Sequence, residues 1–182
     1  LHFACIGGYQ DVCHKLISAE AFVEVETGSN LQPLHFAALS GHTSIAKLLL
    51  AHGADINCLC AEDLQSPLHC AASRGHAMMV SLLINQSAEV DIRNASNATP
   101  LHHASMNNHI RVVERLLDAQ ANPLAVAKNN WTPMLMAFRQ GHMECGRLLE
   151  RTATELKRKT RKGSFNAGTK GAPPRRTRAC RR

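Results

Sequence analysis

The sequence predicts an all-α solenoid of stacked helix-turn-helix units with hairpin loops, followed by a basic tail. Matching segments begin at residues 1, 34, 68, 101 and 134, at spacings of 33 or 34 residues. Self-similarity at such a period is the signature of a repeat architecture, in which each unit packs on its neighbours. The 182 residues include many Ala and Leu but only five Phe, one Tyr and one Trp. This composition favours closely packed helices over a β-sandwich or barrel.

A proline opens the first helix of every unit after the first. In three units the residue before it is Ser or Thr, whose hydroxyl can cap the helix, and Pro suits the first helical position because its missing N–H costs nothing there. In three units a His stands two residues after the proline, where its ring can hydrogen-bond back toward the capping residue. A Gly-His pair then predicts the end of the helix. These positions are Gln32-Pro33, Ser66-Pro67, Thr99-Pro100 and Thr132-Pro133, then His35, His69 and His102, with Gly-His at 41–42, 75–76 and 141–142.

A second helix follows in each unit, with apolar residues on one face. Ile45, Leu48 and Leu49 show the i, i+3, i+4 spacing in the second unit, which is typical of a buried helical stripe. We expect Leu83 and Leu116 to be buried between the helices of the third and fourth units. A left-handed residue, such as the Gly of a Gly-Ala pair, is expected to close the helix, and a polar turn then leads to the next proline.

The aligned units resemble the ankyrin repeat family, whose pattern contains Thr-Pro-Leu-His-x-Ala-Ala, then Gly-His, Leu-Leu and Gly-Ala. About five copies keep register over residues 1 to about 150, the first one truncated, as in LHFAALSGH at 34–42 and LHCAASRGH at 68–76. The resemblance implies two antiparallel helices and an outstretched β-hairpin loop per repeat, stacked into a curved solenoid. It also implies protein–protein recognition on the concave side, which the hairpin tips and the inner helices form.

The later repeats depart from this pattern in an informative way. In the fifth repeat Leu135 replaces the His, Phe138 replaces the second Ala, and Glu150 stands where other repeats carry Leu or Ile. A polar ending is expected of a terminal, capping repeat. In the fourth repeat Asn108 and Gln120 take Gly positions, and Asn tolerates left-handed geometry. The first repeat starts after the place of its own hairpin and cap, so we expect the chain to be a piece of a longer array.

The charge of +7 divides between two segments. Residues 1–150 hold 9 basic and 13 acidic side chains, a net of −4, while residues 151–182 hold 12 basic and 1 acidic, a net of +11. We expect residues 1–150 to form the repeat domain and the tail from 151 to extend the last helix to about 160 before becoming disordered. The tail holds two basic clusters, made by Lys157, Arg158, Lys159, Arg161 and Lys162, and by Arg175, Arg176 and Arg178.

These two clusters leave three interpretations of the tail open. Their spacing resembles a bipartite nuclear-import signal, which would bring a nuclear-import receptor as a partner. Charge alone would also attach such clusters weakly to nucleic acid or to an acidic membrane. A solvated tail without a specific receptor is the third interpretation.

Other classes of protein are disfavoured by the sequence. No apolar run approaches the ~18 residues of a membrane span, and seven scattered cysteines fit reduced thiols in the cytoplasm or nucleus. The recurring His residues lie one repeat apart, so they should make structural hydrogen bonds rather than converge on a metal. Cys58 and Cys60 likewise lack the spacing of a zinc pair. Phosphate-loop, zinc-protease and serine-hydrolase motifs are absent, so we expect a monomeric, non-catalytic protein without a metal or cofactor.

Partner specificity should reside where the repeats differ most. By family analogy these positions are the ends of the inner helices and the hairpin tips, which face the concave groove. Trp131, with Arg74 and Arg139, is the predicted hot spot, since Trp and Arg dominate binding energy at interfaces. The alternative is that Trp131 packs on the neighbouring tip. The candidate partner-binding residues are Leu39, Ser40, Ser73, Arg74, Met106, Asn107, Asn129, Trp131, Arg139 and Gln140.

The leading functional hypothesis is an ankyrin adaptor or scaffold that binds a protein on its concave face. A regulatory segment of a larger enzyme or channel is a second hypothesis. A nucleic-acid-binding or nuclear factor that acts through the tail is a third.

Overall fold

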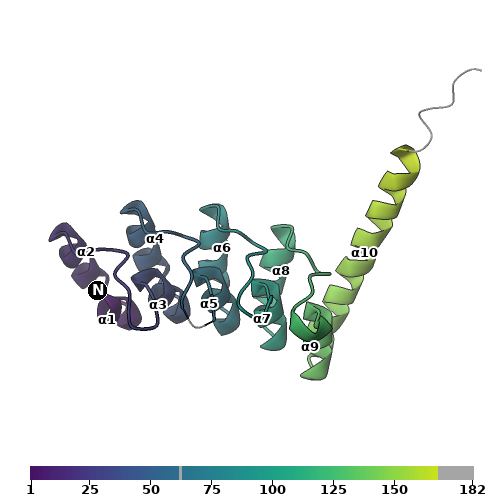
Figure 1. Cartoon of the computed structure of the whole chain (residues 1–182), viewed down its shortest axis with the longest axis horizontal. Helices are drawn as coiled ribbons and strands as arrows, with labels where there is room; N and C mark the ends of the chain where they lie inside the picture. Colours follow the sequence, from purple (N-terminus) through teal and green to yellow (C-terminus); the bar gives the residue numbers. More distant parts are fainter. Residues whose placement is uncertain (62, 168–182) are drawn as a thin grey trace, which may run out of the picture.

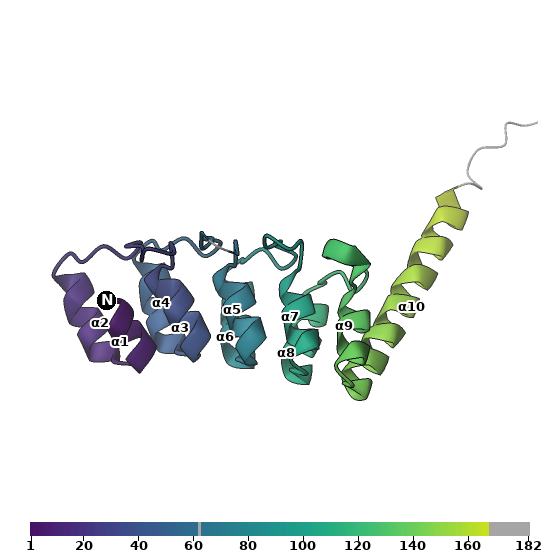
Figure 2. The ribbon, with the colours of Figure 1, turned by 60° about the horizontal axis from the view of Figure 1, so that its bottom comes forward.

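The computed structural model describes residues 1–61 and 63–167. Over these ranges the protein is all-helical, with ten α-helices, one short 3-10 helix and no β-strand. The helices alternate between two rows. Inner helices stack along one side of an elongated solenoid and outer helices along the other, while hairpin loops project from one edge (Figures 1 and 2). The fold predicted from the 33-residue period is therefore confirmed.

Each repeat consists of one inner and one outer helix. The inner helices are α1 (His2–Gly7), α3 (Pro33–Ser40), α5 (Pro67–Arg74), α7 (Pro100–Met106) and α9 (Pro133–Arg139). The outer helices are α2 (Gln10–Ser18), α4 (Thr43–Ala51), α6 (Ala77–Asn85), α8 (Ile110–Asp118) and α10 (Met143–Ala167), and the 3-10 helix η1 spans Lys128–Asn130 in the last hairpin.

The predicted helix starts and ends are confirmed. In α5, for example, the Ser66 hydroxyl accepts a hydrogen bond from the His69 N–H, and the His69 ring accepts one from the Ser66 N–H. The outer helices end at residues with positive φ: 61° at Glu20, 89° at Gly53, 69° at Ser87 and 65° at Gln120. Only one of these four is Gly, so tertiary packing enforces the left-handed turn even where the residue type resists it.

Gly41 shows why the turn between the two helices of a repeat needs a glycine. Its φ is 77°, and a Cβ there would lie 2.7 Å from Nδ1 of His76, which belongs to the next repeat. In the fourth repeat Asn108 adopts φ 58° at the corresponding position, as expected of an Asn that tolerates left-handed geometry.

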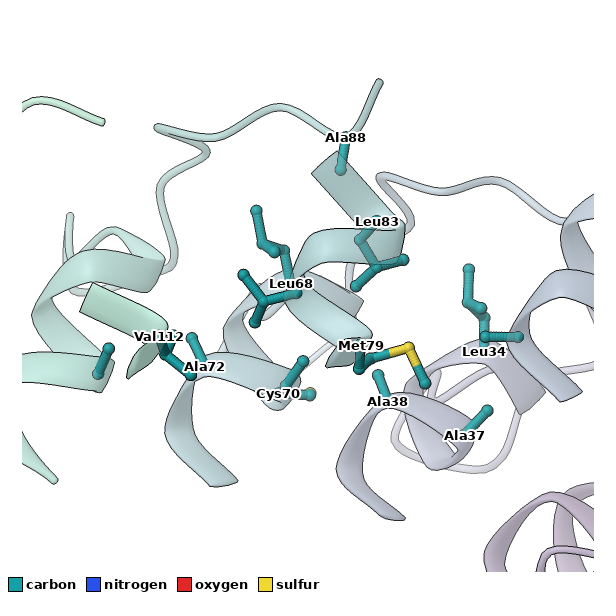
Figure 3. Close-up of a cluster of buried hydrophobic side chains, with 14 of the residues drawn as sticks. Leu34, Ala37, Ala38, Leu68, Cys70, Ala72, Met79, Leu83, Ala88 and Val112 are labelled. Carbon is teal, nitrogen blue, oxygen red and sulfur yellow. The ribbon is translucent and has the colours of Figure 1, made fainter. Parts of the chain in front are cut away.

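One continuous core runs between the two rows of helices. Leu83 and Leu116 are fully buried in it, as expected. In the third repeat Leu68 and Leu83 lie between the inner and outer helices, while Met79 points toward Ala38 of the preceding repeat (Figure 3). Small residues such as Ala38 on the inner helices leave room for this contact, because closely stacked helices need short side chains where they meet.

The last helix is longer than the sequence predicted. We expected it to end near residue 160, but α10 continues to Ala167 and leans away from the other outer helices (Figure 1). Good helix formers continue as far as Arg161 and Lys162, and such straight-chain residues lose little rotamer freedom in a helix. Nothing in the composition of residues 163–167 explains why the helix includes them. The rest of the tail, residues 168–182, lies outside the described residues. No helix within residues 1–61 and 63–167 combines the length and apolar composition that a bilayer crossing requires.

Candidate functional site

The histidines near the start of the inner helices link consecutive repeats. Besides the bond within its own cap, each ring bonds through Nε2 to a backbone carbonyl at the base of the next hairpin. The distances are 3.0 Å from His35 to Gln65 O, 3.0 Å from His69 to Ala98 O and 3.2 Å from His102 to Trp131 O. The predicted hydrogen-bonding role is confirmed, but this second bond was missed, because it joins residues about 30 positions apart.

Burial keeps these rings neutral. Burial is the largest cause that lowers the pKa of His69 and of His102 from 6.5 to about 4, and it lowers the pKa of His35 as well. A neutral ring has one N–H and one bare nitrogen. Since Nδ1 accepts from the capping N–H, Nε2 carries the hydrogen and donates to the carbonyl of the next repeat.

The histidines that follow the turn link each repeat to the preceding one. Their Nε2 atoms bond to carbonyls at the ends of the inner helices, at 3.2 Å from His42 to Ile6, 3.0 Å from His76 to Leu39, 3.1 Å from His109 to Ser73 and 3.1 Å from His142 to Met106. Each of these rings therefore makes its own hydrogen bond between two adjacent repeats, and the rings are spread along the solenoid. Within the described part of the chain, no three His, Cys, Asp or Glu side chains gather in a way that could hold a metal ion.

The hairpin tips form a rim along one edge of the solenoid (Figure 2) and are joined by backbone hydrogen bonds. The N–H groups of Ala61, Ala95 and Lys128 donate to the carbonyls of Ser29, Asp63 and Ser96, at 3.0, 2.8 and 2.9 Å. Each bond joins a tip to that of the adjacent repeat. The rim is consequently a connected row rather than a set of separate loops.

The predicted partner-binding residues at the ends of the inner helices form a row, one repeat apart. Leu39, Ser40 and Ser73 are half-buried there, and Arg74, Met106, Asn107, Arg139 and Gln140 are exposed. One of them also holds adjacent repeats together, since the Asn107 side chain donates to the Ser73 carbonyl at 3.0 Å. The Ser73 hydroxyl donates to the Cys70 carbonyl at 2.9 Å, so these two side chains are less available to a partner than the others.

Four of the candidate residues come together over the fourth and fifth repeats. Met106, Trp131, Arg139 and Gln140, together with Met136, line an open hollow of about 240 Å³. The Arg139 Cζ lies over the Trp131 ring, 4.9 Å from its centroid. The half-buried Trp131 thus stacks with an arginine of its own repeat. Asn129 is exposed in η1, and Leu39, Ser40, Ser73, Arg74 and Asn107 also lie outside this hollow.

A second hollow adjoins the first and involves residues that the sequence did not single out. It measures about 150 Å³ and shares Met106 and Met136 with its neighbour, while His103 and Asn94 contribute to its wall. The Asn94 amide nitrogen lies 3.2 Å from His103 Nε2, and burial lowers the pKa of His103. His103 and Met136 occupy the position held by Phe36 and Cys70 in earlier repeats. This variation within one repeat position was the signal that could have identified them.

The basic tail is described only in part. The side chains of Lys157, Arg158 and Lys159 are exposed along α10. The side chains of Arg161 and Lys162, and all of Arg175, Arg176 and Arg178, lie outside the described residues, so the two-cluster prediction stays a prediction.

Two comparisons with known proteins agree with the repeat pattern. The family described as "Ankyrin repeats (3 copies)" matches residues 1–60 and 57–126. The ankyrin repeat and KH domain-containing protein mask of Drosophila melanogaster is 42% identical over 62 residues, which make up 34% of this chain. The matched stretch is 2% of that relative, so the chain spans a very small part of its length.

Proposed function

Because the chain belongs to the ankyrin-repeat family, whose repeats form a protein–protein interaction module, we propose that it is an adaptor that binds a protein partner on its concave face. The ankyrin-repeat family is generally a non-catalytic interaction fold, and this proposal requires no chemistry beyond recognition. The observation that supports it most is the gathering of Trp131, Arg139 and Met106 around one hollow at the mouth of the groove.

The division of roles along the chain supports the same proposal. Backbone carbonyls and histidine rings form the links between repeats, so the side chains at the ends of the inner helices are largely left for other contacts. Trp, Arg and Met are enriched in the cores of protein interfaces. Such residues over the fourth and fifth repeats are therefore where a partner would gain most from binding.

Affinity capture with the full 182-residue chain tests the proposal. Proteins retained by the wild-type chain should be lost when Trp131→Ala and Arg139→Glu are introduced together. They should be retained by Arg115→Glu, which makes the same charge change on the exposed, outer side of α8. Equal capture by the groove variant and the wild type would place the binding surface elsewhere and reject the concave-face proposal.

A role for the tail in nuclear import or nucleic-acid binding is a second candidate, which the exposure of Lys157, Arg158 and Lys159 favours. A fusion of residues 151–182 to a fluorescent protein should accumulate in the nucleus if the tail is an import signal. If the tail binds nucleic acid, affinity should fall steeply as salt rises and disappear on deleting residues 151–182. Affinity that survives the deletion would reject the nucleic-acid role.

The repeats could also serve as the recognition segment of a larger protein. The Drosophila relative carries ankyrin repeats together with a KH domain, as its name states, and that arrangement supports this alternative. Sequencing of the full transcript tests it, and an open reading frame limited to the repeats and the tail would remove it.

A further inference from the structure

The two adjoining hollows at the C-terminal end of the groove suit side chains rather than a small molecule. Their volumes are about 150 and 240 Å³, below the ~300–1,000 Å³ typical of small-molecule sites. They share Met106 and Met136, so they lie side by side on the groove floor. Each is open on one side, as a site for a side chain that projects from an extended peptide must be.

The smaller hollow presents an apolar surface. Met106, Met136 and Ala98 supply carbon and sulfur atoms, and Met adapts its shape to different apolar partners. The Asn94 side chain is already engaged, because its Oδ1 accepts from the N–H groups of Ser96 and Ala98 and its amide nitrogen contacts His103. An apolar side chain can therefore pack beside the two methionines without displacing these hydrogen bonds.

The larger hollow presents a positive charge without a counter-ion. No carboxylate lines either hollow, and among the described residues no acidic side chain pairs with Arg139. The Arg139 Cζ lies 4.9 Å from the centroid of the Trp131 ring, and this contact restricts the guanidinium while its N–H groups can still reach a planar acceptor. Arginine binds carboxylates through two parallel hydrogen bonds and loses less entropy when it is held beforehand.

Gln140 adds a donor and an acceptor to the same hollow. A side-chain amide can bond both to a backbone N–H and to a backbone carbonyl. An extended peptide offers both groups at every residue, so Gln140 suits its main chain whatever its sequence.

We infer that the partner of this chain presents an extended peptide with a large apolar residue two positions from an Asp or Glu. The apolar side chain occupies the hollow of Met106 and Met136, and the carboxylate pairs with Arg139 over Trp131. Successive side chains of an extended chain point to opposite faces, at about 3.3 Å per residue. Residues two positions apart therefore face the same way and can enter two hollows that share Met106 and Met136. This inference rests on the proposed function and specifies its partner.

The hollow between α8 and α10 does not offer comparable selectivity. It is larger, about 510 Å³, but Glu114 and Glu144 line it together with Arg147 and Arg151. A hollow lined by both acidic and basic side chains favours neither an anionic nor a cationic ligand. Arg147 therefore provides a matched control for the charge change at Arg139.

Selection from a randomised peptide library tests the inference. Peptides of about twelve residues, long enough to cross two repeats, are selected on the full chain, and the enriched sequences are synthesised and measured by fluorescence anisotropy. The enriched peptides should share Leu, Met or Phe two residues from Asp or Glu. Arg139→Glu should weaken their binding by about tenfold or more, Arg139→Lys should weaken it less, and Arg147→Glu should leave it within about twofold.

Selection on Arg139→Glu itself should enrich Lys or Arg in place of the acidic residue. Enriched peptides without an acidic residue, or binding that Arg139→Glu does not change, would overturn the inference. If peptides bind but depend on other repeats, the peptide chemistry fails while the interaction module stands. If no peptide is enriched although affinity capture on the groove succeeds, the partner presents a folded surface. The peptide inference then fails, while the proposed function stands. If capture fails too, both proposals fall.

Discussion

The central repeats and the fifth repeat use the same scaffold differently. In the second, third and fourth repeats a buried His at the start of the inner helix bonds to the next hairpin. In the fifth repeat the corresponding residue, Leu135, is 44% exposed. Beyond α9 the described chain continues into α10 without another hairpin, so a His at 135 would have no such carbonyl to reach. Within the described residues, this polar link is therefore present in each of these three repeats that precedes another hairpin.

The same comparison holds for packing between the two helices of a repeat. At the positions equivalent to Phe138 and Gly146, eight residues apart, the central repeats carry a small residue on the inner helix and an equal or larger one on the outer helix. These pairs are Ala38 and Ala46, Ala72 and Val80, and Ser105 and Val113. In the fifth repeat Phe138 is opposite Gly146, and a Cβ on Gly146 would lie 2.4 Å from the Phe138 ring. In the fifth repeat the large residue is therefore on the inner helix and the small one on the outer helix, which reverses the order of the central repeats.

The opposite end of the solenoid lacks this arrangement. Val12 is 46% exposed, whereas the equivalent residues Ile45, Met79 and Val112 are at most 1% exposed. Met79 points toward Ala38 of the preceding repeat, and Val112 lies beside Ala72 (Figure 3). Packing between repeats is thus directional. One face of a repeat is apolar and needs a neighbour, and the fifth repeat covers the other face with Phe138 and α10.

Acidification should produce the largest effect, because it lowers the stability of the central repeats, which hold the buried histidines, and not that of the fifth repeat. The pKa values of His69 and His102 are lowered from 6.5 to about 4, so the unfolded chain binds more protons between these values. The contribution of these neutral rings to the free energy of unfolding is fully present above pH 6.5. It is lost as the pH falls toward 4, by about 3 kcal/mol per histidine. Urea unfolding from about pH 7 to pH 4.5 measures it. The double variant His69→Gln/His102→Gln should have a flatter profile, and an unchanged slope would contradict the assignment.

Truncation of a buried leucine should affect the central repeats next most strongly. Leu83→Ala and Leu116→Ala should each lower the free energy of unfolding by about 2–5 kcal/mol, as cavities between helices do. Met78 lies on the same helix as Leu83 but is 75% exposed, so Met78→Ala should change it by less than about 0.5 kcal/mol. Losses as small as that at Leu83 and Leu116 would mean that the helix faces are wrongly assigned.

Substitutions at Phe138 and Gly146 that restore the residue sizes of the central repeats should test whether these two residues are coupled. Gly146→Val should destabilise by about 1–3 kcal/mol, because its side chain overlaps the Phe138 ring. Adding Phe138→Ala recreates the Ala–Val pair of the third repeat and should recover most of the loss. Equilibrium unfolding of the two single variants and the double variant gives the coupling energy. Additive effects would show that the two residues are independent.

The sequence was sufficient for the features that recur and insufficient for those that depend on contacts in space. Capping by Ser66 and His69 and the burial of Leu83 follow from local spacing, and they were predicted. The bond from His69 to Ala98 and the overlap of Phe138 with Gly146 join residues whose proximity only the stacked fold creates. At the candidate site, Met106, Trp131, Arg139 and Gln140 were identified because they vary between repeats. His103 and Met136 were missed because an inner-helix position looked like core.

Trp131 gives the most direct test of the claim that the central repeats provide stability and the end of the groove provides recognition. Trp131→Ala should be measured by urea unfolding and by binding of the selected peptides, using one protein preparation. We predict a loss of unfolding free energy below about 1 kcal/mol, since an exposed cation–π contact contributes little, and at least about tenfold weaker binding. A loss above about 2 kcal/mol with unchanged binding would contradict the claim, because Trp131 would then be a structural residue of the last hairpin.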